Sequence, residues 1–240
     1  MSTSNYSELS TKLSPEVLAA LQSYPAEAER RSKNKIQSFF PADGKYRREL
    51  YKPHLEFFAA GAKYRTRVFL AANRTGKTIA GAYEITLHLT GQYPDWWAGK
   101  RFDKPVRAVA ASDTGKTTRE VVQNELLGQP GSFGTGMIPF DALERSTMRG
   151  GVTDAVDTCY VRHTSGKYST LIFKSYEQRR ESFQGLNLEY AWLDEETPSE
   201  IFDEVLTRTA TTDGIVALTF TPLQGLTPLI QRFLPGGLTT

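Results

Sequence analysis

The residues best placed to do chemistry form one stretch, 71–78, with the sequence Ala-Ala-Asn-Arg-Thr-Gly-Lys-Thr. The stretch follows a short apolar run, 68–70, and leads into a helical pattern over 79–89. A strand, a tight loop and a helix with this spacing are typical of a phosphate-binding loop, G-x-x-x-x-G-K-[ST], here with Ala71 in place of the first glycine. Gly76 lets successive N–H groups point at one anion. The start of the helix adds its positive end, so the stretch predicts a phosphate site.

Each loop residue has an expected part in binding a nucleotide. Lys77 would reach the β- and γ-phosphates, and the Thr78 hydroxyl would be a ligand of Mg²⁺. Arg74 adds a second cation next to the phosphates. We therefore predict that ATP and Mg²⁺ bind here. The predicted nucleotide contacts of the loop are Ala72, Asn73, Arg74, Thr75, Gly76, Lys77 and Thr78.

An acidic strand end supplies the second half of such a site. Residues 188–196 form an apolar run that ends in three consecutive carboxylates. We expect Asp194 to hold the metal, and Glu195 to orient and deprotonate the attacking water. Glu196 is one residue too far along the chain to reach the γ-phosphate. The two half-sites together predict an α/β fold of the P-loop NTPase type, in which a mainly parallel sheet lies between helices.

A second stretch, 110–117, has the same relaxed spacing, A-x-x-x-x-G-K-T. Here Asp113 would place a carboxylate inside the anion site, where repulsion is costly. We therefore assign the phosphate to residues 71–78, and interpret 110–117 as the end of a neighbouring strand and the start of a helix over 117–127.

A late apolar run, 215–222, ends in hydroxyl groups. Thr219 and Thr221 would lie at the carboxyl end of a strand beside the acidic one, where a side chain can sense the γ-phosphate. The alternative is that they are ordinary threonines of a strand.

Composition limits the remaining possibilities. The chain has 240 residues, a net charge of +2, three histidines and a single cysteine. One cysteine excludes an internal disulfide and a cysteine-based zinc site. No apolar run approaches the roughly 18 residues of a membrane span, and the polar start does not resemble a signal peptide, so we expect no membrane contact and no secretion.

We predict three segments: a helical N-terminal arm or lid over 1–50, an ATPase unit over 51–234 and the start of a linker over 235–240. In the arm, Ser14 and Pro15 predict a helix start. Between residues 30 and 52, eight Lys/Arg stand against two acids. These charges form either a solvated helix face or a contact with a partner or a phosphate backbone.

Residues 128–151 are glycine-rich without clear periodicity and predict a long loop, which is our guess for a DNA contact.

The motifs taken together resemble those of the large terminase subunit of tailed bacteriophages, over about residues 45–235. The stretches that carry the resemblance are 51–58, 72–78, 182–185, 192–196 and 219–222, in this order. The resemblance implies the additional-strand, RecA-like type of ATPase core, which drives double-stranded DNA into a procapsid through the portal. It also implies Arg74 in γ-phosphate sensing, and Thr219 and Thr221 in coupling hydrolysis to movement.

Other roles are implied by this resemblance alone. His54 falls near the adenine-contacting segment of the family, where glutamine is frequent. Ring ATPases receive an arginine finger from a neighbouring subunit, for which Arg119 is our candidate. The alternatives are Arg101, Arg162 and Arg208.

The resemblance implies further expectations about partners and place. The partners would be double-stranded DNA, the portal protein, the small terminase subunit and further copies in a ring, with a monomer possible in isolation, in the cytoplasm of the host cell. We expect no nuclease activity, because the chain stops soon after the coupling strand. The alternative functions are a helicase-like or recombinase-like ATPase acting on DNA, and a docking module with a purely structural nucleotide site.

Overall fold

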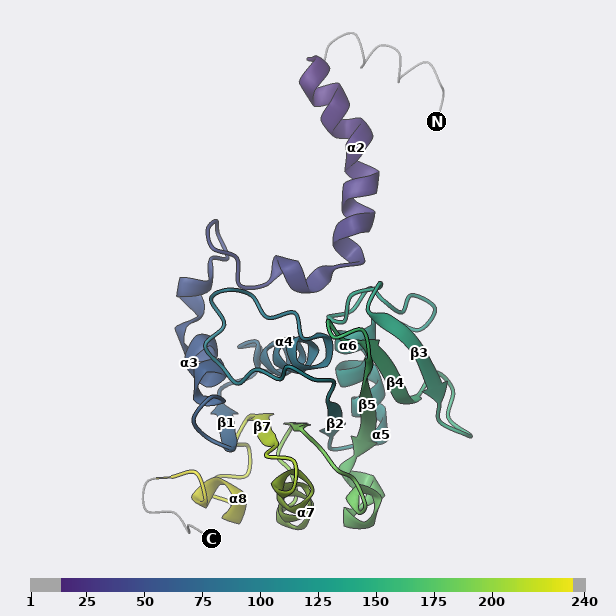
Figure 1. Cartoon of the computed structure of the whole chain (residues 1–240). Helices are drawn as coiled ribbons and strands as arrows, with labels where there is room; N and C mark the ends of the chain where they lie inside the picture. The colour runs from purple at the N-terminus through teal and green to yellow at the C-terminus, as the bar shows by residue number, and fades with distance from the viewer. Residues whose placement is uncertain (1–13, 235–240) are drawn as a thin grey trace.

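The computed structural model describes residues 14–234, so the predicted linker 235–240 and the first 13 residues of the predicted arm lie outside it. Its core is one seven-stranded sheet between two layers of helices (Figure 1). The strands are β1 (Thr66–Leu70), β2 (Arg107–Ser112), β3 (Leu143–Met148), β4 (Val156–Arg162), β5 (Tyr168–Ser175), β6 (Tyr190–Asp194) and β7 (Ile215–Phe220). The α-helices are α2 (Pro15–Ser32), α3 (Lys52–Ala60), α4 (Lys77–Thr90), α5 (Gly115–Thr117), α6 (Asn124–Leu127), α7 (Ser199–Ala210) and α8 (Pro228–Gln231).

The sheet has the order β1-β7-β6-β2-β5-β4-β3. The first five strands pair in parallel, and β5, β4 and β3 pair antiparallel. Strand β7 lies between β1, which leads into the phosphate-binding loop, and the acidic strand β6. An added strand at this position defines the additional-strand type of P-loop fold, so the predicted fold class is confirmed.

Side chains of the strands alternate between the two helical layers. On β6, Tyr190 and Trp192 belong to the core on the α4 side, whereas Ala191 and Leu193 belong to the core on the α7 side. Every residue of β6 and β7 is buried, as expected for parallel strands that are covered on both faces. Because β1, β7 and β6 are neighbouring parallel strands, their carboxyl ends meet at one edge of the sheet.

The described part of the predicted N-terminal arm begins with a helix and ends in the core. Helix α2 starts as predicted, with Pro15 in its first turn and the Ser14 hydroxyl accepting a hydrogen bond from the Val17 N–H, and it projects from the body in Figure 1. After it, the short 3₁₀ helices η1 (Lys35–Ser38) and η2 (Arg48–Tyr51) lead into α3. Between them, Phe40 is buried, with its ring centroid 5.4 Å from that of Phe58.

Two further segments bear on the sequence predictions. The predicted helix 117–127 is one continuous helical run, in which the π-helix η3 (Thr118–Gln123) lies between α5 and α6. The loop predicted over 128–151 is wrong for its last part, because that part contains β3. This edge strand has no buried face and carries register shifts, so its sequence shows no alternation of apolar and polar residues.

Short 3₁₀ helices, η4 (Tyr176–Gln178) and η5 (Arg180–Phe183), follow β5 beside α7. Within residues 14–234 no helix has the length and apolar character needed to cross a membrane.

A buried ion pair joins β1 to α4 under the phosphate-binding loop. Arg67 donates to the Glu84 carboxylate, and both side chains are almost fully buried. His88 Nε2 lies 3.3 Å from Glu84 Oε1, and Tyr190 donates its hydroxyl hydrogen to Oε2 over 3.2 Å. The network therefore holds α4 in one position against the sheet.

We expect Glu84→Gln to lower the free energy of unfolding by about 3–5 kcal/mol, because it leaves the buried Arg67 cation without a countercharge. Urea unfolding of the nucleotide-free protein measures this loss. Glu56→Gln is the control, since Glu56 forms only an exposed pair with Lys52 at 3.8 Å. Equal stability of the two variants would contradict the assignment.

Candidate functional site

The phosphate-binding loop joins β1 to α4 with the backbone shape that an anion site needs. Gly76 has φ +85°, a left-handed conformation that glycine adopts without strain, and α4 begins at the next residue. Arg74 also has a positive φ, +62°. A Cβ on Gly76 would lie 3.0 Å from His54 Nε2, so a larger residue would press on that ring.

Lys77 is held inside the loop. Its Nζ donates to the Ala72 carbonyl over 2.7 Å, and the side chain has no carboxylate partner among the described ion pairs. The Thr75 hydroxyl donates to the same carbonyl over 2.8 Å. The ammonium group is therefore placed over the loop, where an incoming phosphate can replace the carbonyl. Ala72, Asn73 and Arg74 are exposed along the loop.

Thr78 and Asp194 bring the two half-sites together. The Thr78 hydroxyl lies 3.3 and 3.4 Å from the two carboxylate oxygens of Asp194, although the residues are 116 positions apart in sequence. Asp194 is only 2% exposed, and Thr219 donates to its Oδ1 over 2.7 Å. Hydroxyl and carboxylate oxygens are the ligands that Mg²⁺ prefers, so the residues at this point fit the metal.

Burial raises the pKa of Asp194 to about 7, and the Glu195 charge adds to this effect. The hydrogen bonds from Thr219 and Thr78 and the charge of Lys77 act in the opposite direction, but do not cancel the burial. A cation beside this carboxylate would favour its ionised form.

Glu195 leaves the strand in an unusual backbone conformation. Its φ is +67°, which a non-glycine residue adopts only when surrounding contacts hold it there. The Glu195 N–H donates to the Thr219 carbonyl over 3.0 Å. The preceding carbonyl, that of Asp194, accepts from the Tyr176 hydroxyl over 2.9 Å, and Thr197 donates to that hydroxyl over 2.9 Å. The sequence does not predict Tyr176 or Thr197 as residues of the site, because neither belongs to a motif.

Burial raises the pKa of the Glu195 carboxyl, and the Asp113 charge raises it further. Lys77 lowers it, so the ammonium and this carboxylate face one region of the site. A half-buried carboxylate with a raised pKa is a suitable proton acceptor near neutral pH.

The two threonines of β7 touch one half-site each. Thr219 contacts Asp194, as described above. The Thr221 hydroxyl lies 3.0 Å from the Ala71 carbonyl and 2.8 Å from Asn73 Oδ1. A movement of the loop or of Asp194 would therefore displace a side chain of β7 in either case.

The second loop, 110–117, already carries its own acceptors. The Gly115 N–H donates to Glu177 Oε2 over 2.8 Å, and the Thr114 N–H donates to Asp113 Oδ1 over 2.7 Å. The Thr114 hydroxyl accepts from the Thr117 N–H over 3.0 Å. Two carboxylates at this helix start repel a phosphate, which agrees with the choice of residues 71–78.

His54 lies at an aromatic pocket beside the phosphate-binding loop. The pocket has a volume of about 520 Å³, and the residues that line it include Phe39, Phe40, Tyr46, Tyr51, His54, Arg74, Thr75, Gly76 and Ile79. Burial lowers the pKa of His54, which favours the neutral form of its ring. Flat apolar walls next to the phosphate loop suit a purine base.

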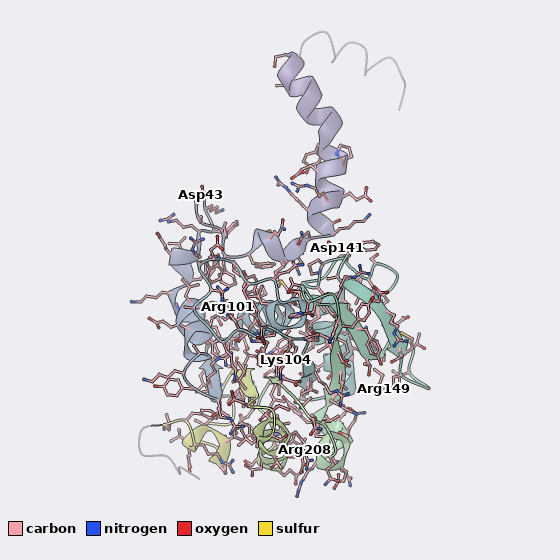
Figure 2. The ribbon with its side chains drawn as sticks, viewed as in Figure 1. Asp43, Arg101, Lys104, Asp141, Arg149 and Arg208 are labelled. Carbon is pink, nitrogen blue, oxygen red and sulfur yellow. The ribbon has the colours of Figure 1, made fainter. Side chains whose placement is uncertain are left out.

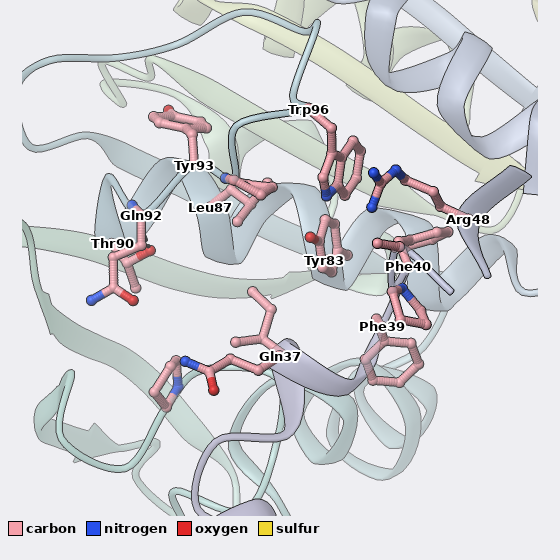
Figure 3. Close-up of a pocket in the computed structure, with 15 residues that line it drawn as sticks. Gln37, Phe39, Phe40, Arg48, Tyr83, Leu87, Thr90, Gln92, Tyr93 and Trp96 are labelled. Carbon is pink, nitrogen blue, oxygen red and sulfur yellow. Dashed lines mark hydrogen bonds between the residues drawn. The ribbon is translucent and has the colours of Figure 1, made fainter. Parts of the chain in front are cut away.

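Phe40 also lines a second cavity, of about 420 Å³ (Figure 3). Its wall includes Tyr83, Trp96 and Arg48, whose guanidinium lies 5.6 Å from the centre of the Trp96 ring. No residue of the phosphate-binding loop lines this cavity, so it is less suited to a nucleotide base than the aromatic pocket is.

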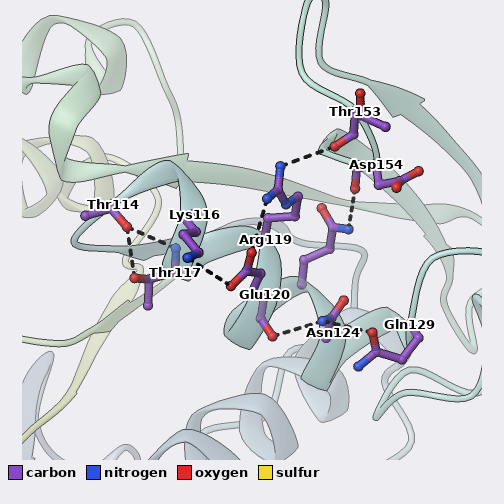
Figure 4. A network of polar contacts seen from close by, with 10 residues as sticks. Thr114, Lys116, Thr117, Arg119, Glu120, Asn124, Gln129, Thr153 and Asp154 are labelled. Carbon is purple, nitrogen blue, oxygen red and sulfur yellow. Dashed lines mark hydrogen bonds and ion pairs between the residues drawn. The ribbon is translucent and has the colours of Figure 1, made fainter.

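The four candidate arginine fingers are held with different strength. Arg119, on η3, donates to the Thr153 carbonyl over 3.4 Å and to Glu120 over 3.2 Å (Figure 4). Arg101 makes only 3.3 Å bonds to carbonyls. Arg162 and Arg208 are each in a 2.7 Å ion pair with a glutamate; Figure 2 shows Arg208 on the α7 side of the sheet. Arg119 and Arg101 are therefore the easiest to release toward a neighbour.

The raised pKa of Asp194 predicts how stability depends on pH. The folded, nucleotide-free protein keeps this proton up to about pH 7, whereas an unfolded aspartate loses it near pH 4. The stabilising contribution of the protonated carboxyl is complete below about pH 4, and is lost as pH rises through about 7.

Asp194→Asn mimics the protonated carboxyl. We expect its melting temperature to exceed that of the wild type by a margin that grows from pH 4 to pH 8, in buffer without metal or nucleotide. Asp141→Asn, at an exposed position labelled in Figure 2, should show no such trend. A constant difference between Asp194→Asn and the wild type would contradict the burial argument.

Comparisons with known proteins agree on one family. The family model "Terminase large subunit, T4likevirus-type, N-terminal" matches residues 68–237. The large terminase subunit of Salmonella phage P22 is 34% identical over 204 residues, which cover 77% of this chain and 41% of that protein. This chain thus spans about two fifths of the length of that curated relative.

Two solved structures are similar to this chain at lower sequence identity. A large terminase from a thermophilic bacteriophage, in complex with ADP, is 16% identical with a TM-score of 0.48, over 71% of this chain and 38% of that one. A mutant ATPase domain of the Thermus phage P74-26 large terminase is 20% identical with a TM-score of 0.47, over 74% and 68% of the two chains. The match over residues 68–237 takes in the phosphate-binding loop, the acidic strand and β7, and the chain therefore belongs to the large terminase subunit family, of which it matches the N-terminal part.

Proposed function

We propose that this chain hydrolyses ATP and is the motor unit of a DNA-packaging terminase. The observation that carries the proposal is the meeting of Thr78, Asp194 and Thr219 within hydrogen-bonding reach, directly beside Lys77 and Glu195. In P-loop ATPases these residue types perform phosphate binding, metal binding, γ-phosphate sensing and water activation.

The residues divide the work as follows. Lys77 and the loop N–H groups bind the phosphates, and the positive end of α4 adds to their attraction. Thr78 and Asp194 would hold Mg²⁺, which neutralises phosphate charge when it is bound. The Glu195 carboxylate accepts the proton of the attacking water, and its raised pKa suits that task near neutral pH. Arg74, in the loop, adds positive charge near the γ-phosphate.

Contacts of β7 provide a path from hydrolysis to movement. Through its hydrogen bond to Asp194, Thr219 would move when Asp194 moves. Through its hydrogen bond to the Ala71 carbonyl, Thr221 would move when the phosphate-binding loop moves. We propose that this path drives double-stranded DNA through the portal into a procapsid in the host cytoplasm, with the chains arranged in a ring and with the small terminase subunit as a further partner. The family membership and the basic charges of residues 30–52 support these partners.

Binding of ATP tests the proposal directly. Isothermal titration should show ATP binding to the wild type in the presence of Mg²⁺, and a loss of at least about 100-fold in affinity for Lys77→Ala, because a charge-assisted contact to phosphate is lost. Lys116→Ala, in the second A-x-x-x-x-G-K-T loop, is the matched control and should bind as the wild type. Equal affinities of the two variants, or no binding by the wild type, would overturn the proposal.

A further inference from the structure

Trp192 is a fully buried tryptophan two residues before Asp194 on the acidic strand. Its indole N–H donates to the Thr219 hydroxyl oxygen over 2.7 Å. The same hydroxyl donates to Asp194 Oδ1 over 2.7 Å. The three side chains thus form a directed chain of hydrogen bonds inside the protein.

The chemistry of the donors fixes the direction of this chain. An indole N–H can only donate, so the Thr219 oxygen must accept from it. The single hydroxyl hydrogen of Thr219 is then left to point at Asp194. Without the indole, that hydroxyl could rotate toward another acceptor.

The other side of the indole lies directly on α4. A Cβ added to Gly81 would come within 2.1 Å of Trp192 Nε1 and Cε2, so only glycine allows the ring to lie there. Gly81 is one helical turn after Lys77 and Thr78, on the same helix. The ring is therefore in contact with the helix that begins at the phosphate site and with the strand that carries Thr219.

We propose that Trp192 is a positioning residue, which directs the Thr219 hydroxyl to Asp194 and couples this contact to the position of α4. The inference rests on the proposed function, because the site that it positions is the proposed ATP site. It accounts for two features that the phosphate and acidic motifs leave unexplained: an indole in the acidic strand and a glycine inside helix α4.

Trp192→Phe tests the proposal, because it keeps an aromatic ring and removes the N–H donor. We expect the rate of hydrolysis at saturating Mg²⁺ and ATP to fall about tenfold, as for the loss of one hydrogen bond to a charged pair. We also expect the ratio of ATP affinities measured with and without Mg²⁺ to fall about tenfold, which a general loss of stability would not cause.

Trp97→Phe is the matched control. Trp97 is also buried and donates its indole N–H over 3.0 Å, but to the Lys100 carbonyl, away from the site. It should keep the wild-type rate and the wild-type Mg²⁺ ratio. If Trp192→Phe and Trp97→Phe behave alike while the wild type hydrolyses ATP, the positioning role is wrong and the proposed function stands. If the wild type binds no ATP with Mg²⁺, both are wrong.

A second approach does not depend on the folding of Trp192→Phe. The sequence has three tryptophans, so Trp96→Phe combined with Trp97→Phe leaves Trp192 as the sole source of tryptophan fluorescence, excited selectively over the tyrosines. Its emission should shift when ATP and Mg²⁺ bind, and the shift should be absent in the same chain with Lys77→Ala. An emission that stays constant while titration calorimetry shows binding would overturn the inference.

Gly81→Ala approaches the same contact from the helix. Because the added methyl group overlaps the indole, we expect it to reproduce the loss of rate and of the Mg²⁺ ratio seen for Trp192→Phe. The double variant should lose no more than either single variant, since both break one connection. Full additivity of the two losses would contradict a shared role.

Discussion

Glu195→Gln is expected to lower the rate of ATP hydrolysis by roughly 10²–10⁴-fold, the usual contribution of a general base. Glutamine has nearly the same shape but cannot accept the proton of the attacking water. The strained backbone at this residue is held by Thr219 and by the Tyr176 hydroxyl, so the substitution should leave the fold unchanged. ATP affinity should stay within about threefold of the wild type, because the carboxylate does not hold the phosphates.

Glu196→Gln is the matched control for this variant. Glu196 is the next carboxylate in the chain, and it accepts a hydrogen bond from Thr227 instead of facing the site. Single-turnover hydrolysis of both variants separates chemistry from product release. A slow Glu196→Gln and an active Glu195→Gln would reverse our assignment of the base.

Arg119→Ala is expected to lower hydrolysis by about 10³–10⁵-fold if this residue is the finger that one copy supplies to the next. Such a loss acts between copies, so it can be recovered by mixing. A Glu195→Gln chain is inactive but still offers Arg119 to its neighbour. Mixing it with Arg119→Ala should therefore restore hydrolysis, measured as phosphate release against the ratio of the two chains.

The alternative arginine fingers are distinguished by the activity of their alanine variants, alone and in the same mixing experiment. Arg162→Ala should retain activity, because Arg162 is held by Glu144 within its own chain. Arg101→Ala tests the other weakly held candidate. Loss of activity in Arg162→Ala or Arg101→Ala, together with an active Arg119→Ala, would transfer the role to that arginine. An inactive Arg119→Ala that no mixture rescues would contradict a contribution between copies.

The parts of the fold predicted from the sequence are those with a strong local pattern. The glycine, lysine and threonine of residues 71–78 require one backbone form between a strand and a helix, so loop, strand and helix follow together. The buried strands β6 and β7 are continuous apolar runs that end in polar groups. Edge strand β3 lacks any such pattern, because it has no buried face, and its sequence therefore predicts a loop.

The site residues that the sequence did not reveal act through contacts between distant segments. Tyr176 comes directly after β5, yet holds the Asp194 carbonyl on β6. The aromatic pocket takes Phe39 and Tyr46 from the N-terminal segment, and no spacing rule connects them to the phosphate-binding loop. The run of aromatic residues before β1 is the available signal, but such residues are more often part of a core than in contact with a ligand.

The central claim is that residues 71–78 and Asp194–Glu195 form one Mg²⁺-dependent ATPase site. Its most direct test is phosphate release by the wild-type chain over a wide range of protein concentrations, with double-stranded DNA present, in Mg²⁺ and again in EDTA. We predict hydrolysis that requires Mg²⁺ and whose rate per molecule rises with protein concentration. Hydrolysis that EDTA leaves unchanged, or no hydrolysis at any concentration, would contradict the claim.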